Sequence, residues 1–142
     1  MSSLMIGGQP FIKEKHTIHV YWKGVKRYTD ENGEDTPDKA GVYEILTKRK
    51  DEDRYDRKYI GQAVDLRARY FDHLSNEEEN ENIHEGVRKW VCGFDHALLD
   101  LEADRKDAEQ AIYDKHKHPW NKERPEGSGR SSDIEVVEHN PG

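Results

Sequence analysis

The sequence predicts an α+β fold in which a small antiparallel β-sheet, with about three core strands, is flanked by helices. Two segments with strand-like alternation, 41–47 and 58–61, are joined by a short charged stretch, as in a β-hairpin. Helical spacing of apolar residues follows in later segments. The chain of 142 residues has room for one domain with flanking segments, so we expect no second independent domain.

The composition predicts a thin core. Apolar residues make up 32% and charged residues 37% of the chain, compared with about 45–50% and about 25% in an average soluble protein. No stretch approaches the roughly 20 apolar residues that cross a bilayer, and residues 1–11 lack the features of a secretory signal. We therefore expect an intracellular protein, in the cytoplasm or with DNA, and no membrane partner. The single cysteine, Cys92, excludes an internal disulfide and is expected to be buried and inert.

Residues 1–40 are expected to form an N-terminal extension that contributes a possible extra strand. The β-branched and aromatic run 17–22 favours this strand, and the polar stretch 29–39, with its Asn-Gly pair and proline, favours a loop. The hairpin follows, with strands over 41–47 and 58–61.

A helix is predicted after Asp65, because Asp65 is a suitable N-cap and apolar residues then recur at helical spacing. Arg69 and His73 are four residues apart, so both project from the same face of this helix. These two side chains are the first candidates for a functional site.

The second half of the chain predicts two more helices and a strand. A helix is expected over 81–90, with Trp90 in its apolar stripe, and the third core strand over 94–101. A last helix opens near Asp104 and ends before Pro119.

From residue 122 onward Pro, Gly, Ser and charged residues predominate. We therefore expect 122–142 to be a mostly flexible tail, although the run 134–137 is compatible with an edge strand. The formal net charge of −7 argues against tight binding to long DNA. The acid excess lies in the second half, since residues 1–75 hold 14 basic and 13 acidic side chains and 76–142 hold 9 and 17. Its densest run, 77–81, is interpreted as a solvated loop.

Two short motifs point to a family. Gly41-Val42-Tyr43 and Tyr59-Ile60-Gly61, whose tyrosines are 16 residues apart, resemble the paired motif that names the GIY-YIG nucleases. The segment 59–69 resembles the family's strand, turn and helix with its arginine, here Arg69. His73 falls where many members have His or Tyr.

The resemblance continues to residue 121. Glu109 lies in the last predicted helix, and Pro119-Trp120-Asn121 resembles the family's closing Pro-x-Asn element. Residues 41–121 are accordingly expected to be a GIY-YIG nuclease domain. This resemblance implies an endonuclease that hydrolyses DNA phosphodiester bonds, with Mg²⁺ or Mn²⁺ as cofactor. Duplex or branched DNA is the expected partner, and a homodimer or a targeting protein is compatible with the sequence.

The resemblance also implies roles for the catalytic residues. Glu109 is the expected metal ligand, because Mg²⁺ prefers oxygen ligands and is often held by one or two carboxylates. Arg69 offers a planar charged fork to the scissile phosphate. Tyr43 is assigned as the general base that activates water, and Tyr59 orients water or phosphate. A tyrosine needs a nearby cation for this role, since its pKa is ordinarily about 10.

Several assignments remain open at this stage. His73 polarises the water, stabilises the Tyr43 phenolate or assists the leaving group, and Asn121 tethers the backbone or touches the phosphate.

The resemblance also raises a question about the cation beside the base. Gln62 stands where other members place a lysine, so Lys58 and Arg67 are the candidate cations near the phenolate. Lys58, Gly61 and Arg67 are the expected substrate-binding residues.

Each residue also has an ordinary structural interpretation. Tyr43 and Tyr59 suit packing within strands, Arg69 suits a surface ion pair, and Glu109 suits the first turn of a helix. Their order and spacing together favour the nuclease. Two alternatives stay open: a nuclease module targeted by a partner protein that the acidic surface of 76–107 recruits, and a nucleic-acid-binding domain without catalysis.

Overall fold

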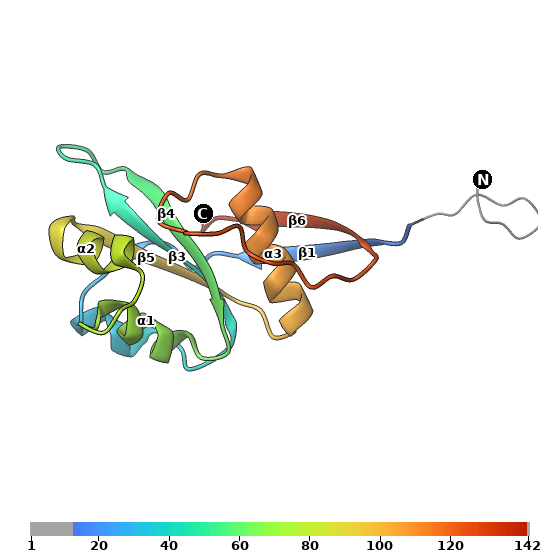
Figure 1. Ribbon diagram of the computed structural model, residues 1–142, viewed down its shortest axis with the longest axis horizontal. Coiled ribbons are helices and arrows are strands. Elements are labelled where there is room, and N and C mark those ends of the chain that lie inside the picture. The colour runs from blue at the N-terminus through green and yellow to red at the C-terminus, as the bar shows by residue number, and fades with distance from the viewer. Residues whose placement is uncertain (1–12, 142) are drawn as a thin grey trace, which may run out of the picture.

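A four-stranded antiparallel sheet in the order β2-β5-β3-β4 lies at the centre of the computed structural model (Figure 1). Residues 13–141 are described; residues 1–12 and 142, which include the start of the expected N-terminal extension, lie outside this part. The predicted fold class, α+β with an antiparallel sheet flanked by helices, is confirmed. The elements are β1 (Lys15–Tyr21), β2 (Lys26–Arg27), the 3₁₀ helix η1 (Glu31–Asp35), β3 (Gly41–Lys48), β4 (Tyr55–Ala63), α1 (Leu66–Leu74), α2 (Glu81–Lys89), β5 (Cys92–Leu98), α3 (Glu102–Lys115) and β6 (Asp133–His139).

Strands β3 and β4 form the predicted hairpin and set the register of the sheet. Tyr43 lies opposite Gly61, and Ile45 lies opposite Tyr59, before a bulge at Lys58 shifts the pairing. β5 pairs with the other edge of β3. Successive residues of a strand point to opposite faces, so alternate residues of β3 enter two different cores.

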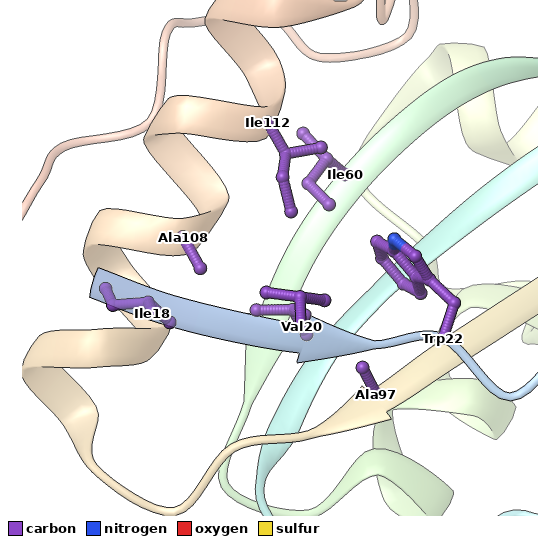
Figure 2. Close-up of a cluster of buried hydrophobic side chains, with 8 residues drawn as sticks. Ile18, Val20, Trp22, Ile60, Ala97, Ala108 and Ile112 are labelled. Carbon is purple, nitrogen blue, oxygen red and sulfur yellow. The ribbon is translucent and has the colours of Figure 1, made fainter. Parts of the chain in front are cut away.

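On one face of the sheet, α3 and β1 cover an apolar cluster (Figure 2). Figure 2 shows Ile112 next to Ile60, and Trp22 next to Ala97. Burial of a large aliphatic side chain stabilises a fold by about 1.5–3 kcal/mol, so this cluster fixes α3 against the sheet. Its buried members are Ile18, Val20, Trp22, Val42, Ile60, Ala97, Ala108 and Ile112.

The other face is covered by α1 and α2. As predicted, Asp65 caps α1, with its carboxylate accepting a hydrogen bond from the Ala68 amide at 3.0 Å. Asn80 caps α2 in the same way. Beneath these helices lies an aromatic-rich cluster of Tyr28, Tyr43, Ile45, Leu66, Tyr70, Ile83, Cys92 and Phe94. Cys92 is buried, as expected, and burial raises its pKa to about 11.

The segment expected to be a mostly flexible tail carries β6 and takes part in the fold. β6 pairs in parallel with β1 from Lys15 to Tyr21, so the two form a separate two-stranded sheet. The edge strand expected over 134–137 lies within it. The loop before β6 is fixed to α3, because the Asp107 carboxylate accepts hydrogen bonds from the Ser128 amide at 2.8 Å and from Arg130 Nε at 2.7 Å. The division at residues 40 and 122 stays a prediction, but both flanking segments pack on the same core.

The expectation that Trp90 packs in the core is wrong. Its side chain is 54% exposed, whereas Trp22 is 4% exposed. The reason is that α2 ends at Lys89 and Trp90 has an extended backbone, with φ −114° and ψ 157°, which takes it out of the apolar stripe. None of the helices within residues 13–141 is both long and apolar enough to cross a membrane.

Gly86 provides a test of the packing on α2. A Cβ atom at Gly86 would lie 2.2 Å from Cη2 of Trp120, so the indole occupies the place of a side chain. We expect Gly86→Ala to destabilise the protein by about 1–3 kcal/mol through overpacking, although alanine favours a helix by about 1 kcal/mol over glycine. Urea unfolding measures the difference. In a Trp120→Ala background the penalty is expected to vanish, and a Gly86→Ala protein as stable as the parent would refute the packing.

Candidate active site

The structure brings most of the predicted site residues together at the β4 edge of the sheet. The rings of Tyr43 and Tyr59 lie 6.1 Å apart between centroids, and the His73 ring lies 5.4 Å from each. Arg69 and Glu109 are close enough for their charges to shift the pKa of both tyrosines. Residues from β3, β4, α1 and α3 therefore converge, although they are far apart in the sequence.

Tyr43 is buried, with 1% of its surface exposed. Its ring lies across Gly61, where a Cβ atom would come within 2.4 Å of the phenol carbon Cζ. Gly61 thus provides space for the tyrosine. Burial holds the pKa of Tyr43 well above its usual range, and the guanidinium of Arg69 opposes this effect. At neutral pH the resting side chain is a neutral phenol.

His73 links Tyr43 to a carboxylate. Its Nε2 lies 2.6 Å from the Tyr43 hydroxyl, and its Nδ1 contacts the Glu78 carboxylate. Burial lowers the pKa of His73, so the ring is neutral at pH 7. A neutral ring that donates Nδ1–H to Glu78 leaves the Nε2 lone pair to accept the Tyr43 proton. A buried Tyr43–His73–Glu78 chain of hydrogen bonds results.

Tyr59 lies between this chain and solvent. Burial raises its pKa, and the charge of Arg69 again acts in the opposite direction. Tyr59 lines an open groove of about 420 Å³ together with Asn80, Glu109 and Asn121. Its position suits the orientation of a water molecule or a phosphate in the groove.

Arg69 supplies positive charge at the mouth of the site. Its side chain is 41% exposed and lies 3.8 Å from the Asp72 carboxylate, a weak surface ion pair. It lines two adjoining grooves, one toward Glu78 and Asn80 and the other toward Gln62. The guanidinium is therefore near both tyrosines and also accessible from solvent.

Glu109 is a carboxyl group without a strong countercharge. Burial raises its pKa to about 7, and only the charge of Lys106 on the same helix lowers it. Among the ion pairs of residues 13–141, none involves Glu109. Within the same residues no three His, Cys, Asp or Glu side chains form a metal-binding group. A single carboxyl group that lines an open groove fits a hard cation held by one carboxylate and water.

Asn121 is a tether, one of the two roles considered for it. Its Oδ1 accepts a hydrogen bond from the Ile60 amide at 3.0 Å, and its Nδ2 donates to the Ile60 carbonyl at 3.0 Å. The adjacent Trp120 amide donates to the Lys58 carbonyl at 2.8 Å. These bonds cover the outer edge of β4 and hold Tyr59 and Gly61 in place.

The candidate cations Lys58 and Arg67 have other positions. Arg67 Nε donates to the Thr36 carbonyl at 2.8 Å and so fixes a loop, whereas Lys58 is the bulge residue of β4. Gln62 accepts a hydrogen bond from Arg105 Nε at 3.0 Å. Arg69 is the cation that acts on Tyr43. Substrate binding by Lys58, Gly61 and Arg67 stays a prediction.

Two residues of the site, Glu78 and Asn80, were not predicted from the sequence. Glu78 belongs to the acidic run that was interpreted as a solvated loop, yet it is the partner of His73. Asn80 caps α2 and donates from Nδ2 to the Trp120 carbonyl at 2.9 Å. Only the position of Glu78, just after the helix that carries His73, gave a signal for this contact.

No protein-family model matches the chain, and no curated protein matches it. Among solved structures it is similar to the GIY-YIG N-terminal endonuclease domain of UvrC from Thermotoga maritima. A tyrosine point mutant of that domain, bound to its catalytic divalent cation, shares 19% identity at a TM-score of 0.49, covering 64% of this chain and 92% of that chain. The same domain bound to magnesium shares 22% identity at a TM-score of 0.47, with 64% and 92% covered.

The link between His73 and Glu78 is open to direct measurement. Because the Glu78 carboxylate stabilises the imidazolium form, Glu78→Gln should lower the already depressed pKa of His73 further. The imidazole resonances of His73, followed by NMR against pH, report this shift. Glu79→Gln is the matched control, since Glu79 is the exposed neighbour in the same run. Equal titration of His73 in both variants would show that Glu78 does not act on it.

Proposed function

We propose that the chain is a metal-dependent endonuclease that hydrolyses phosphodiester bonds in DNA. The observation that carries this proposal is the convergence of the Arg69 guanidinium and the Glu109 carboxyl on Tyr43 and Tyr59, beside the Tyr43–His73–Glu78 chain of hydrogen bonds. The motifs Gly41-Val42-Tyr43 and Tyr59-Ile60-Gly61 support it, because they resemble those of GIY-YIG nucleases.

Glu109 would hold the divalent cation, Mg²⁺ or Mn²⁺. A cation beside it would supply the positive charge that this half-buried carboxylate needs to remain ionised at pH 7. When bound, the metal neutralises negative charge that develops on the phosphoryl group during hydrolysis. Asn80 and Asn121 line the same groove, and their amide groups are engaged in fixing the backbone around it.

The protein residues provide the proton transfers. Tyr43 gives its hydroxyl proton to His73 Nε2, and the resulting phenolate accepts a proton from the attacking water. The water oxygen forms a bond to phosphorus as the bond to the leaving oxygen breaks, and the leaving oxygen keeps the electron pair of that bond and takes up a proton from solvent. Glu78 stabilises the imidazolium that forms, as the carboxylate does in a Ser-His-Asp triad.

Arg69 and Tyr59 position the substrate in this scheme. Arg69 binds non-bridging phosphate oxygens through its guanidinium fork, and its charge also favours the Tyr43 phenolate. Tyr59 holds the phosphate or the water from the groove side. An intracellular location, with access to DNA, belongs to the same proposal.

Metal binding to Glu109 should depend on pH. Because the pKa of Glu109 is higher in the folded protein, the protonated carboxyl stabilises the metal-free protein. This stabilisation is lost as the pH rises from about 4.5 through about 7. A cation requires the ionised form. We therefore expect Mg²⁺ to raise the melting temperature more at pH 8 than at pH 6, measured by thermal unfolding.

Glu109→Gln should remove both this metal effect and cleavage of supercoiled plasmid in Mg²⁺. Glu102→Gln is the matched control on the same helix, because Glu102 is exposed and its carboxylate lies 3.7 Å from Lys106 Nζ. Cleavage by a folded Glu109→Gln protein at saturating Mg²⁺ would disprove its role as ligand. If the wild-type protein cleaves none of the plasmid, duplex, branched and single-stranded substrates, the proposed function is overturned.

Cleavage should require the Arg69 side chain but not the Arg67 side chain. Removing a positioned charge from a phosphoryl-transfer site typically lowers kcat by about 10³-fold or more, so Arg69→Ala should lose nearly all cleavage. Arg67→Ala, two residues away on the same helix, should keep activity within about tenfold because its side chain is bound to the Thr36 carbonyl. Single-turnover cleavage rates compare the two, and a reversed order of effects would contradict the site geometry.

A further inference from the structure

A second surface with the chemistry of a nucleic-acid site lies beyond the catalytic groove. A cleft of about 320 Å³ separates the β3–β4 turn from the end of α2. Figure 1 shows the hairpin projecting past the sheet at the end of the molecule where α2 lies. We call this the hairpin cleft; it is lined by Lys48, Arg49, Lys50, Asp51, Lys89, Trp90 and Val91.

The indole of Trp90 forms the apolar part of the hairpin cleft. It is 54% exposed, and the adjoining Val91 is 42% exposed. Lys89 Nζ lies 5.7 Å from the centre of the indole ring. Indoles are among the most apolar side chains and are usually shielded from water, and the fold itself gains little from leaving this one outside. An exposed ring beside a lysine suits a planar ligand that carries negative charge.

Charge distinguishes the hairpin cleft from the rest of the protein. Its lining has four basic residues and one acidic residue, whereas the whole chain has a formal net charge of −7. Arg49 is bound to the Asp56 carboxylate at 2.9 Å, and Lys48 lies 3.4 Å from the exposed Asp53. Lys50 and Lys89 form no ion pair within residues 13–141 and are available to a ligand.

We propose that the hairpin cleft binds an unpaired nucleic-acid strand, with one base stacked on Trp90 and phosphates near Lys50 and Lys89. Stacking on aromatic rings combined with basic side chains is how proteins bind single strands without sequence preference. A base within a duplex has no free face to offer, so a stacking site selects unpaired nucleotides. This inference rests on the proposed function and specifies the substrate: DNA with an unpaired segment next to the cleavage position.

The hairpin cleft and the candidate active site share structural elements. The β3–β4 hairpin carries Tyr43 and Tyr59, and its turn lines the hairpin cleft. α1, which carries Arg69, and α2, which precedes Trp90, cover the same face of the sheet. The hairpin cleft is therefore built on the elements that also form the candidate active site.

Binding without cleavage tests the proposal. Fluorescence anisotropy of a labelled single-stranded oligonucleotide, titrated in EDTA, should show that Trp90→Ala weakens binding about 5- to 100-fold. Lys50→Ala should reduce the slope of log K against log salt by about 1. Tyr21→Ala and Lys15→Ala are matched controls, because both residues are exposed on β1, away from the hairpin cleft. Neither control should change the affinity by more than about twofold.

The outcomes separate this proposal from the proposed function. Wild-type affinity of a folded Trp90→Ala protein for the single strand, or an equal loss with intact duplex, would overturn the hairpin cleft as a single-strand site. Metal-dependent cleavage with no effect of Trp90→Ala on binding would leave the nuclease intact and remove only this inference. Binding that depends on Trp90, in a protein that cuts nothing, would support the hairpin cleft and reject the nuclease.

Discussion

The cross-strand pair of Tyr43 and Gly61 is the constraint on which the site depends. A glycine opposite the tyrosine allows the ring to lie flat over β4, and the hydroxyl then reaches His73 Nε2 at 2.6 Å. Any side chain at Gly61 would displace the ring and break the connection to α1. Packing of Tyr43, in the first motif, thus requires the glycine of the second motif. Asn121 holds the strand of the second motif from its outer edge.

Burial determines the protonation states of the titratable side chains in the resting site. It raises the pKa of Tyr43 and Tyr59, lowers that of His73 and raises that of Glu109 to about 7. Each shift favours a neutral group, since the charged form of each is poorly solvated there. Arg69 is the positive charge that opposes the shifts of both tyrosines. In the proposed nuclease, a cation and a phosphate would enter this site together, because each offsets the charge of the other.

Local patterns in the sequence predicted the hairpin, the Asp65 cap and the shared face of Arg69 and His73, because these depend on residues close together in the chain. The contact of His73 with Glu78 was missed, since an acidic run has the same composition whether or not one member turns inward. The pairing of β6 with β1 joins residues more than 110 positions apart; the run 134–137 was compatible with an edge strand, but its local pattern does not identify the partner strand. Trp90 was misplaced because apolar spacing does not reveal the residue at which a helix ends.

The flanking segments explain how Glu109 keeps its place. Helix α3 carries Glu109 and is held at its start by Arg105, whose Nη1 donates to the Asp100 carbonyl and whose Nε donates to Gln62 on β4. Asp107, two residues before Glu109, is bonded to Ser128 and Arg130 of the loop that leads to β6. β1 and β6 complete the cluster beneath the same helix. The position of Glu109 depends on the position of α3, so segments outside the motif region contribute to the geometry of the candidate site.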